Sequence, residues 1–234
     1  MKFKISEEVF KILPTACFGV VVAKGIDNSH EYPQLTNMLN DAISEAELHF
    51  NGKKPKEDPA ILPYRDAFRK LSINPNKFMS SIEALLTRVS KKKGLPHINP
   101  IVDMGNAISL KYSLPIGAHD IAQADSDIEV RFSRDGDTFI PFGEREIETI
   151  PAGELVYTVG TKVRTRRWIW RQSELGKITN ASSDIMFPID GFSDSNKAAI
   201  LNAREEIASI CKQVLNCKCV NIGFIDASST EFEL

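Results

Sequence analysis

The sequence predicts one α+β domain whose sheets are covered by helices. Helical spacing of apolar residues dominates positions 33–112, whereas alternation of apolar and polar residues dominates positions 127–189. A further helical segment and a strand follow. No linker, internal repeat or low-complexity segment divides the 234 residues, so we expect a single domain over 1–234.

The composition carries no bias towards a membrane or a nucleic acid. The net charge of −2 implies that any nucleic-acid contact must use a local patch. No apolar window has the length of a membrane span, and the N-terminus lacks the apolar run of a signal peptide. The four cysteines form neither a disulfide framework nor a metal-binding spacing. We therefore expect a cytoplasmic protein with no metal or other cofactor, and neither a membrane nor DNA as partner.

The first half predicts one buried strand followed by helices. The valine-rich run at 17–23 is typical of a buried strand. Apolar residues then recur at helical spacing over 33–50 and 63–71. The polar segment between these helices predicts a solvated connection, with a mobile flap as the alternative.

Two successive helices share one start signal. Asn-Pro pairs at 74–75 and 99–100 can each supply a capping side chain and a proline at the first helical position. The first helix is expected to end at Gly94, where the lysines at 91–93 complement the helix dipole. An RNA contact by these lysines is the alternative.

The second of these helices contains an unusual pair of residues. Gly105 in a helix interior costs roughly 1 kcal/mol relative to alanine, which indicates close approach by another element or a ligand. Asn106 is a poor helix former but a good hydrogen-bonding group. A loop of small residues follows Pro115 and contains His119. Asn106 and His119 could polarise a carbonyl or position a water, although a lone loop histidine is more often structural.

Alternating segments follow. A strand is expected over 128–132, and Asp135-Gly136 predicts a hairpin with 138–142. Further elements are expected in this order: strands over 154–159 and 184–189, a helix over 194–215 and a strand over 220–224.

The most unusual predicted strand is 162–172, KVRTRRWIWRQ. As a strand it would place Arg166, Trp168 and Trp170 on one face. Arginines bind phosphates, and exposed indole rings stack on unpaired bases. The alternative, weighted equally, puts the tryptophans in the core and pairs the arginines with acidic residues. The RNA-binding hypothesis selects Arg166, Arg167, Trp168, Trp170 and Arg171, together with Arg65 on the 63–71 helix.

Two short motifs support a family resemblance. INPIVD at 98–103 with Asn106, and PIGAHD at 115–120, keep the spacing of I-N-x-V-V-D-V-T-N followed by P-L-H-A-F-D. They resemble the B3/B4 domain of the bacterial phenylalanyl-tRNA synthetase β subunit, most strongly over 59–191. RRWIWRQSE at 166–174 resembles free-standing relatives of this domain.

The resemblance implies an editing domain, which in the synthetase hydrolyses tyrosine mis-attached to the phenylalanine tRNA. Asn106 matches the family's pocket asparagine. The family's threonine falls at Gly105, its histidine at Gly117 and its glutamate near Pro188. His119 and Asp190 are the nearest side chains that could replace the histidine and the glutamate.

We therefore expect a stand-alone domain that binds the aminoacylated end of a tRNA and removes a mis-attached amino acid in trans. No ATP-binding or class II synthetase motif is visible, so a complete ligase is not expected. The alternative is a non-catalytic module for RNA, a free amino acid or another small carboxylate. The expected catalytic residues are Asn106, His119 and Asp190. The expected binding residues are Arg65, Gly105, Gly117, Arg166, Arg167, Trp168, Trp170 and Arg171.

Overall fold

The structure, a computed structural model, describes all residues from 1 to 234 and confirms the α+β class. The helices are α1 (Glu7–Ile12), α2 (Pro33–His49), the 3-10 helix η1 (Pro55–Glu57), α3 (Leu62–Lys70), α4 (Ser81–Ser90), α5 (Pro100–Tyr112) and α6 (Lys197–Gln213). The strands are β1 (Lys2–Ile5), β2 (Ala16–Lys24), β3 (His119–Asp120), β4 (Ile128–Phe132), β5 (Thr138–Phe139), β6 (Glu148–Thr149), β7 (Leu155–Val159), β8 (Lys162–Arg166), β9 (Arg171–Gln172), β10 (Ile185–Phe192), β11 (Cys219–Ile225) and β12 (Glu231–Glu233).

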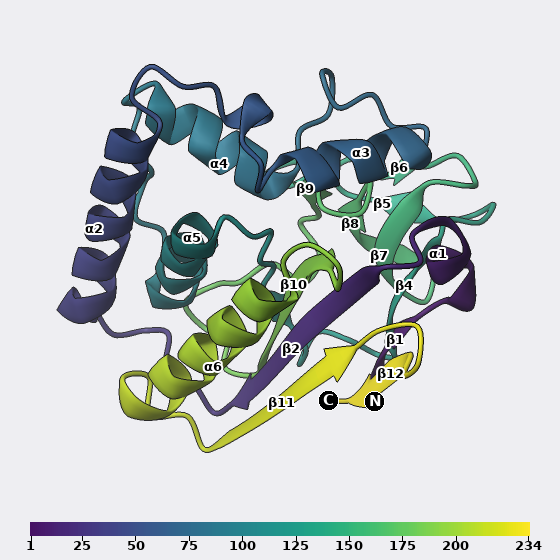
Figure 1. Ribbon diagram of the computed structural model, residues 1–234. Helices are drawn as coiled ribbons and strands as arrows, with labels where there is room; N and C mark the ends of the chain where they lie inside the picture. The colour runs from purple at the N-terminus through teal and green to yellow at the C-terminus, as the bar shows by residue number, and fades with distance from the viewer.

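The strands form two sheets. The larger sheet has the order β12-β1-β4-β7-β8-β5-β6, with β9 beside β8. The smaller sheet has the order β11-β2-β10-β3, and all its neighbouring strands are antiparallel. Because β1 pairs with both β4 and β12, the two chain ends lie side by side at the edge of the larger sheet (Figure 1).

The smaller sheet is the middle layer of the molecule. On β2, Cys17 and Val21 belong to the hydrophobic core shared with α5 and α6. Val20 and Val22 point the other way, into the core that includes β1, β4 and β7. The long strand β10 lies beside β2, so its residues also contact either the helices or the larger sheet (Figure 1).

Helix α5 begins where the sequence predicts. The side chain of Asn99 accepts a hydrogen bond from the Val102 N–H at 3.1 Å, and Pro100 occupies the first turn. The predicted apolar face is confirmed, since Ile101, Met104 and Ile108 are fully buried. Their packing fixes the rotation of α5 about its axis, and thereby the direction of its remaining faces.

The predicted helix start at Asn74 is wrong. The Asn74 side chain accepts a hydrogen bond from the Asn76 N–H at 2.9 Å and forms a turn. Helix α4 begins at Ser81, and the Ser80 hydroxyl accepts a hydrogen bond from the Glu83 N–H. Asparagine side chains satisfy backbone donors in turns as well as at helix starts, so the Asn-Pro pair does not distinguish the two.

The predicted continuous strand over 162–172 is also wrong. Strand β8 ends at Arg166, and β9 turns back to pair with it antiparallel. Within the turn, Arg167 and Trp168 have φ values of +46° and +59°, which bulky residues rarely adopt. The turn directs Trp168 into the core, where it is fully buried, so it does not share an open face with Arg166.

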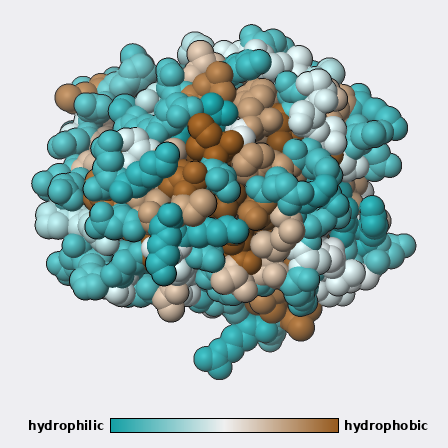
Figure 2. Space-filling view, turned by 90° about the horizontal axis from the view of Figure 1, so that it is seen from below, coloured by the Kyte–Doolittle hydropathy of each residue, from teal (hydrophilic) through white to brown (hydrophobic).

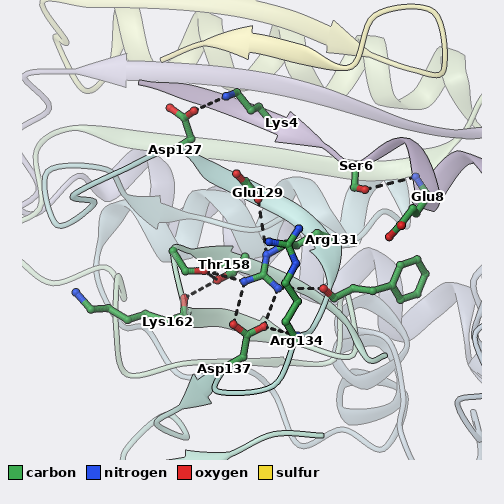
Figure 3. A network of polar contacts seen from close by, with 12 residues as sticks. Lys4, Ser6, Glu8, Asp127, Glu129, Arg131, Arg134, Asp137, Thr158 and Lys162 are labelled. Atoms are coloured by element: carbon green, nitrogen blue, oxygen red, sulfur yellow. Dashed lines mark hydrogen bonds and ion pairs between the residues drawn. The ribbon is translucent and has the colours of Figure 1, made fainter. Parts of the chain in front are cut away.

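The predicted hairpin at Asp135-Gly136 has a different pairing. The chain turns there, but β4 pairs with β1 and β7, whereas β5 pairs with β6 and β8. The buried Arg131 guanidinium donates to both carboxylate oxygens of Asp137, at 2.7 and 2.9 Å (Figure 3). Arg131 also binds the Gly160 carbonyl at 2.8 Å, so this ion pair joins the turn after β4 to the turn after β7.

None of the helices has the length and apolar character needed to cross a membrane. Apolar side chains form a band on the face that Figure 2 shows from below. The outer strand β11 lies on this lower side in Figure 1, and its Ile222 is 40% exposed. Ile222 lines none of the cavities described below.

Candidate functional site

Two neighbouring cavities lie where α5, β9 and β10 come together. The outer groove has a volume of about 410 Å³, and the inner cavity has a volume of about 90 Å³. Four residues line both spaces: Ile116, Gly117, Trp170 and Gln172. The outer groove is further lined by Gly105, Asn106, Arg171 and apolar residues, and the inner cavity by His119, Tyr157, Trp168 and Asp190. The shared wall makes the two spaces neighbours that one ligand could occupy together.

Part of the shared wall is the segment 115–120, which runs antiparallel along β10. The Gly117 N–H donates to the Pro188 carbonyl at 2.9 Å, and the Asp190 N–H donates to the Pro115 carbonyl at 3.1 Å. A Cβ on Gly117 would lie 3.1 Å from Pro188 Cγ and 3.4 Å from His119 Nε2. Glycine at this position therefore permits the close approach to β10 and places no Cβ against the His119 ring.

Tyr157 connects the two ionisable groups of the inner cavity. Its ring stacks on the His119 imidazole, with centroids 5.4 Å apart and an interplanar angle of 18°. Its hydroxyl donates to Asp190 Oδ1 at 2.6 Å, and Trp168 Nε1 donates to the same oxygen at 2.6 Å. Both bonds end on Oδ1, so Asp190 Oδ2 has no protein donor and can bind a ligand or a water in the cavity.

Burial changes the proton affinity of both groups. Burial, assisted by the nearby Arg164 charge, lowers the pKa of His119 to about 3, so the imidazole is neutral at physiological pH. His119 Nδ1 is buried and has no hydrogen-bond partner. Burial raises the pKa of Asp190 to about 7, although its hydrogen bonds from Tyr157 and Trp168 act in the opposite direction. A carboxyl group with such a pKa can both accept and return a proton near neutral pH.

The outer groove presents an unpaired amide on α5. The Asn106 side chain is half-buried and makes no hydrogen bond within the chain, so its donor and acceptor are both free. The cations beside it are already paired: Arg171 binds Glu144 at 2.9 Å, and Lys177 binds Glu174. No cluster of three or more His, Cys, Asp or Glu side chains is arranged to hold a metal ion. The groove therefore favours hydrogen bonding by Asn106 over capture of a free carboxylate.

Gly105 has no packing reason to be glycine. A Cβ added to it would meet no atom within 4 Å, and the residue faces the outer groove. Replacing Gly105 by alanine should therefore raise the free energy of unfolding by about 0.5–1 kcal/mol, because alanine is the better helix former. Urea denaturation measures this difference.

The matched control for this prediction is Gly117→Ala. Its added Cβ meets Pro188, so the variant should gain no stability and should lose some if the wall cannot shift. A loss of stability in Gly105→Ala would show that an unseen contact, rather than a ligand, requires this glycine.

The predicted RNA-binding arginines have partners within the protein. Arg166 donates to both carboxylate oxygens of Glu154, at 2.8 and 3.1 Å. The Arg167 guanidinium lies 4.0 Å from the Phe78 ring centroid and 4.6 Å from that of Trp170. Neither arginine lines the two cavities.

Arg65 and Trp168 also lie elsewhere than the RNA-binding hypothesis expects. Arg65 is buried, donates to Glu83 and Asn76, and lies outside both cavities. Trp168 contributes to the inner cavity but is 0% exposed, so the interpretation of its indole as an open stacking surface is wrong. Trp170 remains partly exposed at the wall that both cavities share.

Four polar residues of the inner cavity were not expected from the sequence: Ser81, Tyr157, Thr165 and Gln172. Tyr157 lies in a strand that reads as ordinary core, although a buried tyrosine hydroxyl requires a partner and could have been flagged for that reason. Its partner Asp190 lies 33 positions away in the sequence, and no local signal connects the two.

Comparison with known proteins agrees with the resemblance carried by the two motifs. The B3/4 domain family matches residues 63–226. The phenylalanine–tRNA ligase β subunit of Colwellia psychrerythraea (strain 34H / ATCC BAA-681) is 30% identical over 113 residues, which are 48% of this chain and 13% of that protein. An N-terminal fragment of the phenylalanyl-tRNA synthetase β subunit from Pyrococcus horikoshii is similar in structure, with a TM-score of 0.49 and 11% identity over 93% of this chain and 49% of the fragment.

The family match extends from α3 to the end of β11. Every residue that lines the outer groove and the inner cavity lies within it. The chain belongs to the B3/4 domain family.

Proposed function

We propose that the chain, as one domain, binds the aminoacylated end of a tRNA and hydrolyses the ester of a mis-attached amino acid. One observation carries this proposal. A buried carboxyl group with a free oxygen, Asp190, and a neutral histidine, His119, line a small cavity beside a groove that carries the free Asn106 amide. The family relationship to a tRNA ligase subunit supports an aminoacyl-tRNA as the substrate.

The proposed chemistry needs no covalent nucleophile, because an aminoacyl ester is already activated. Asp190 Oδ2 accepts a proton from a water whose oxygen attacks the ester carbonyl carbon. The bond from that carbon to the ribose oxygen then breaks, and Asp190 returns the proton to the ribose oxygen. N–H donors of Asn106 and neutral His119 stabilise the negative charge that develops on the carbonyl oxygen.

The volumes of the inner cavity and the outer groove indicate which part of the aminoacyl-tRNA end each would hold. The inner cavity of about 90 Å³ has room for about three waters, or for a small side chain with the attacking water. The outer groove of about 410 Å³ is large enough for the terminal nucleoside, with Trp170 available to stack on its base. Gly117, which lines both spaces, and Gly105, which lines the outer groove, add no side chain to them.

A deacylation assay with a panel of mischarged tRNAs tests the proposal. We expect release of at least one amino acid above the rate in buffer. Asn106→Ala should slow it by about 10²-fold, the loss typical of one removed oxyanion donor. Asn202→Ala is the matched control, because Asn202 is an exposed asparagine within helix α6 and should leave the rate unchanged.

If no tRNA of the panel is deacylated above buffer, the hydrolytic proposal fails. Calorimetric titration of free amino acids would then test the non-catalytic alternative. Equal deacylation rates for the wild type and Asn106→Ala would show that Asn106 takes no part in the reaction, and that the reacting ester does not lie in the outer groove.

A further inference from the structure

A third cavity, the basic groove, lies between the 50–56 segment and α4. Its volume is about 610 Å³, the largest of the three. The helix contributes Glu83, Thr87 and Ser90 from one face, and the 50–56 segment, dark blue in Figure 1, runs beside it. The remaining lining residues are Phe50, Gly52, Lys53, Lys54, Pro55, Lys56, Arg65, Pro75, Asn76, Met79 and Lys91.

The basic groove is strongly positive in a chain whose net charge is −2. Its single carboxylate, Glu83, is paired with its single arginine, Arg65, at 2.5 Å. The four lysines are therefore in excess, and only Lys54 has an ion-pair partner, Glu57 at 3.5 Å. Lys53, Lys56 and Lys91 are exposed and unpaired. Such a concentration of positive charge attracts a ligand with several negative charges.

The groove is built on fixed residues. Phe50 and Pro55 are buried and anchor the segment that carries three of the lysines. Below them, the buried Arg65 binds the Pro75 carbonyl at 3.1 Å and the Asn76 side chain at 2.6 Å. The lysine side chains therefore extend from a segment anchored at two points, and the polar residues of that segment are exposed, as expected for the solvated connection.

An unsatisfied acceptor adds a second feature. Glu83 is 2% exposed, and its Oε2 has no hydrogen-bond partner, although Oε1 binds Arg65. A buried acceptor without a donor is costly, so a ligand that supplies a hydroxyl there would be favoured. Phosphates beside a hydroxyl donor are the chemistry of the ribose-phosphate backbone, and the 2′-hydroxyl separates RNA from DNA.

We propose that the basic groove is a second binding site, which holds the backbone of the RNA whose end enters the outer groove. This inference rests on the proposed function for the identity of the RNA. The segment 75–81 joins the two regions, because Pro75, Asn76 and Met79 line the basic groove and Ser81 lines the inner cavity. In this proposal the RNA leaves the basic groove beside the start of α4, where Ser81 borders the inner cavity.

The test measures binding of unacylated tRNA as a function of salt. The triple variant Lys53→Gln, Lys56→Gln, Lys91→Gln should lower the slope of log affinity against log salt by about 2–3, since each lost phosphate contact removes about 0.7–0.9. The matched control is Lys11→Gln, Lys212→Gln, Lys218→Gln, which removes three exposed lysines outside the groove. Its slope should equal that of the wild type.

Two further readouts separate this inference from the proposed function. Hydrolysis of aminoacyl-adenosine, which has no backbone to occupy the groove, should be the same in the triple variant and the wild type. If the wild type binds tRNA with a steeper salt slope than the triple variant but hydrolyses no aminoacyl-tRNA, the basic groove is supported as an RNA-binding site and the proposed function fails. An unchanged slope in the triple variant, absence of tRNA binding by the wild type, or equal affinity for single-stranded RNA and DNA of one sequence would overturn the inference.

Discussion

Replacing Trp168 by alanine should destabilise the protein by about 3–5 kcal/mol, the usual cost of removing a large buried aromatic side chain. The indole is fully buried, and its ring centroid lies 5.9 Å from that of Phe192 and 6.4 Å from those of Tyr64 and Phe68. The change also removes a donor to Asp190. Thermal unfolding should show a midpoint lowered by roughly 10 °C for a chain of this size.

Trp170→Ala is the matched control for this prediction. Trp170 is partly exposed, and its ring contacts Phe78 and the Arg167 guanidinium near the surface. Its loss should cost about 1 kcal/mol, close to the average for point substitutions. If Trp168→Ala proves as stable as the wild type and Trp170→Ala unfolds, the positions assigned to the two indoles are reversed.

Under the proposed function, the main effect of Trp170→Ala is on RNA binding, which should become weaker.

The elements predicted well from the sequence are those whose signals are local. Helix α5 needs only Asn99 to cap it, Pro100 to start it and a regular apolar face, and all three lie within a few residues. Strand β2 is equally readable, because every residue but its last is buried and the run is rich in valine. In both cases tertiary packing and local preference point to the same structure.

The turn at 167–168 shows why other elements could not be predicted. A left-handed backbone usually carries glycine or asparagine, but arginine and tryptophan occupy it here. The stabilising contacts come from distant residues, chiefly Asp190 and the aromatic rings around Trp168. Strands β1 and β12 alternate charged and apolar residues but are only four and three residues long, so their pairing with each other and with β4 is what identifies them.

The residues of the candidate site also differ in whether a local sequence signal identifies them. Asn106 and His119 were selected because their residue types are unusual in their local setting. The structure places them in adjacent cavities, one beside α5 and one beside β10. The role of Tyr157 depends on a contact between strands of two different sheets, which no single segment encodes.

Asp190→Asn should make the protein increasingly stable, relative to the wild type, as the pH rises from about 4 to about 8. In the folded protein the pKa of Asp190 is about 7, above its ordinary value of 3.8, so the folded state holds a proton that the unfolded state has lost. The stabilising contribution of this group is complete below its ordinary pKa and is lost as the pH rises through 7. A pKa difference of about 3 corresponds to at most about 4 kcal/mol.

The comparison must be made between the two proteins at each pH, because His119 acts in the opposite direction. Its pKa is lowered from 6.5 to about 3, so its contribution to stability is present above 6.5 and is lost as the pH falls. In the wild type the two effects largely cancel between pH 4 and 6.5. Urea denaturation of both proteins at several pH values isolates the contribution of Asp190 to the free energy of unfolding.

Asparagine suits this test because it keeps the shape of the side chain. Its Oδ1 can still accept the hydrogen bonds from Tyr157 and Trp168, so only the charge is removed. The same variant should lose deacylation activity by about 10²–10⁴-fold, the contribution expected of a general base. A protein that is more stable at pH 8 but inactive would mark Asp190 as a residue that costs stability and serves function. A stability difference that does not change with pH would show that the pKa of Asp190 is not raised, and would contradict its proposed role of both accepting and returning the proton near neutral pH.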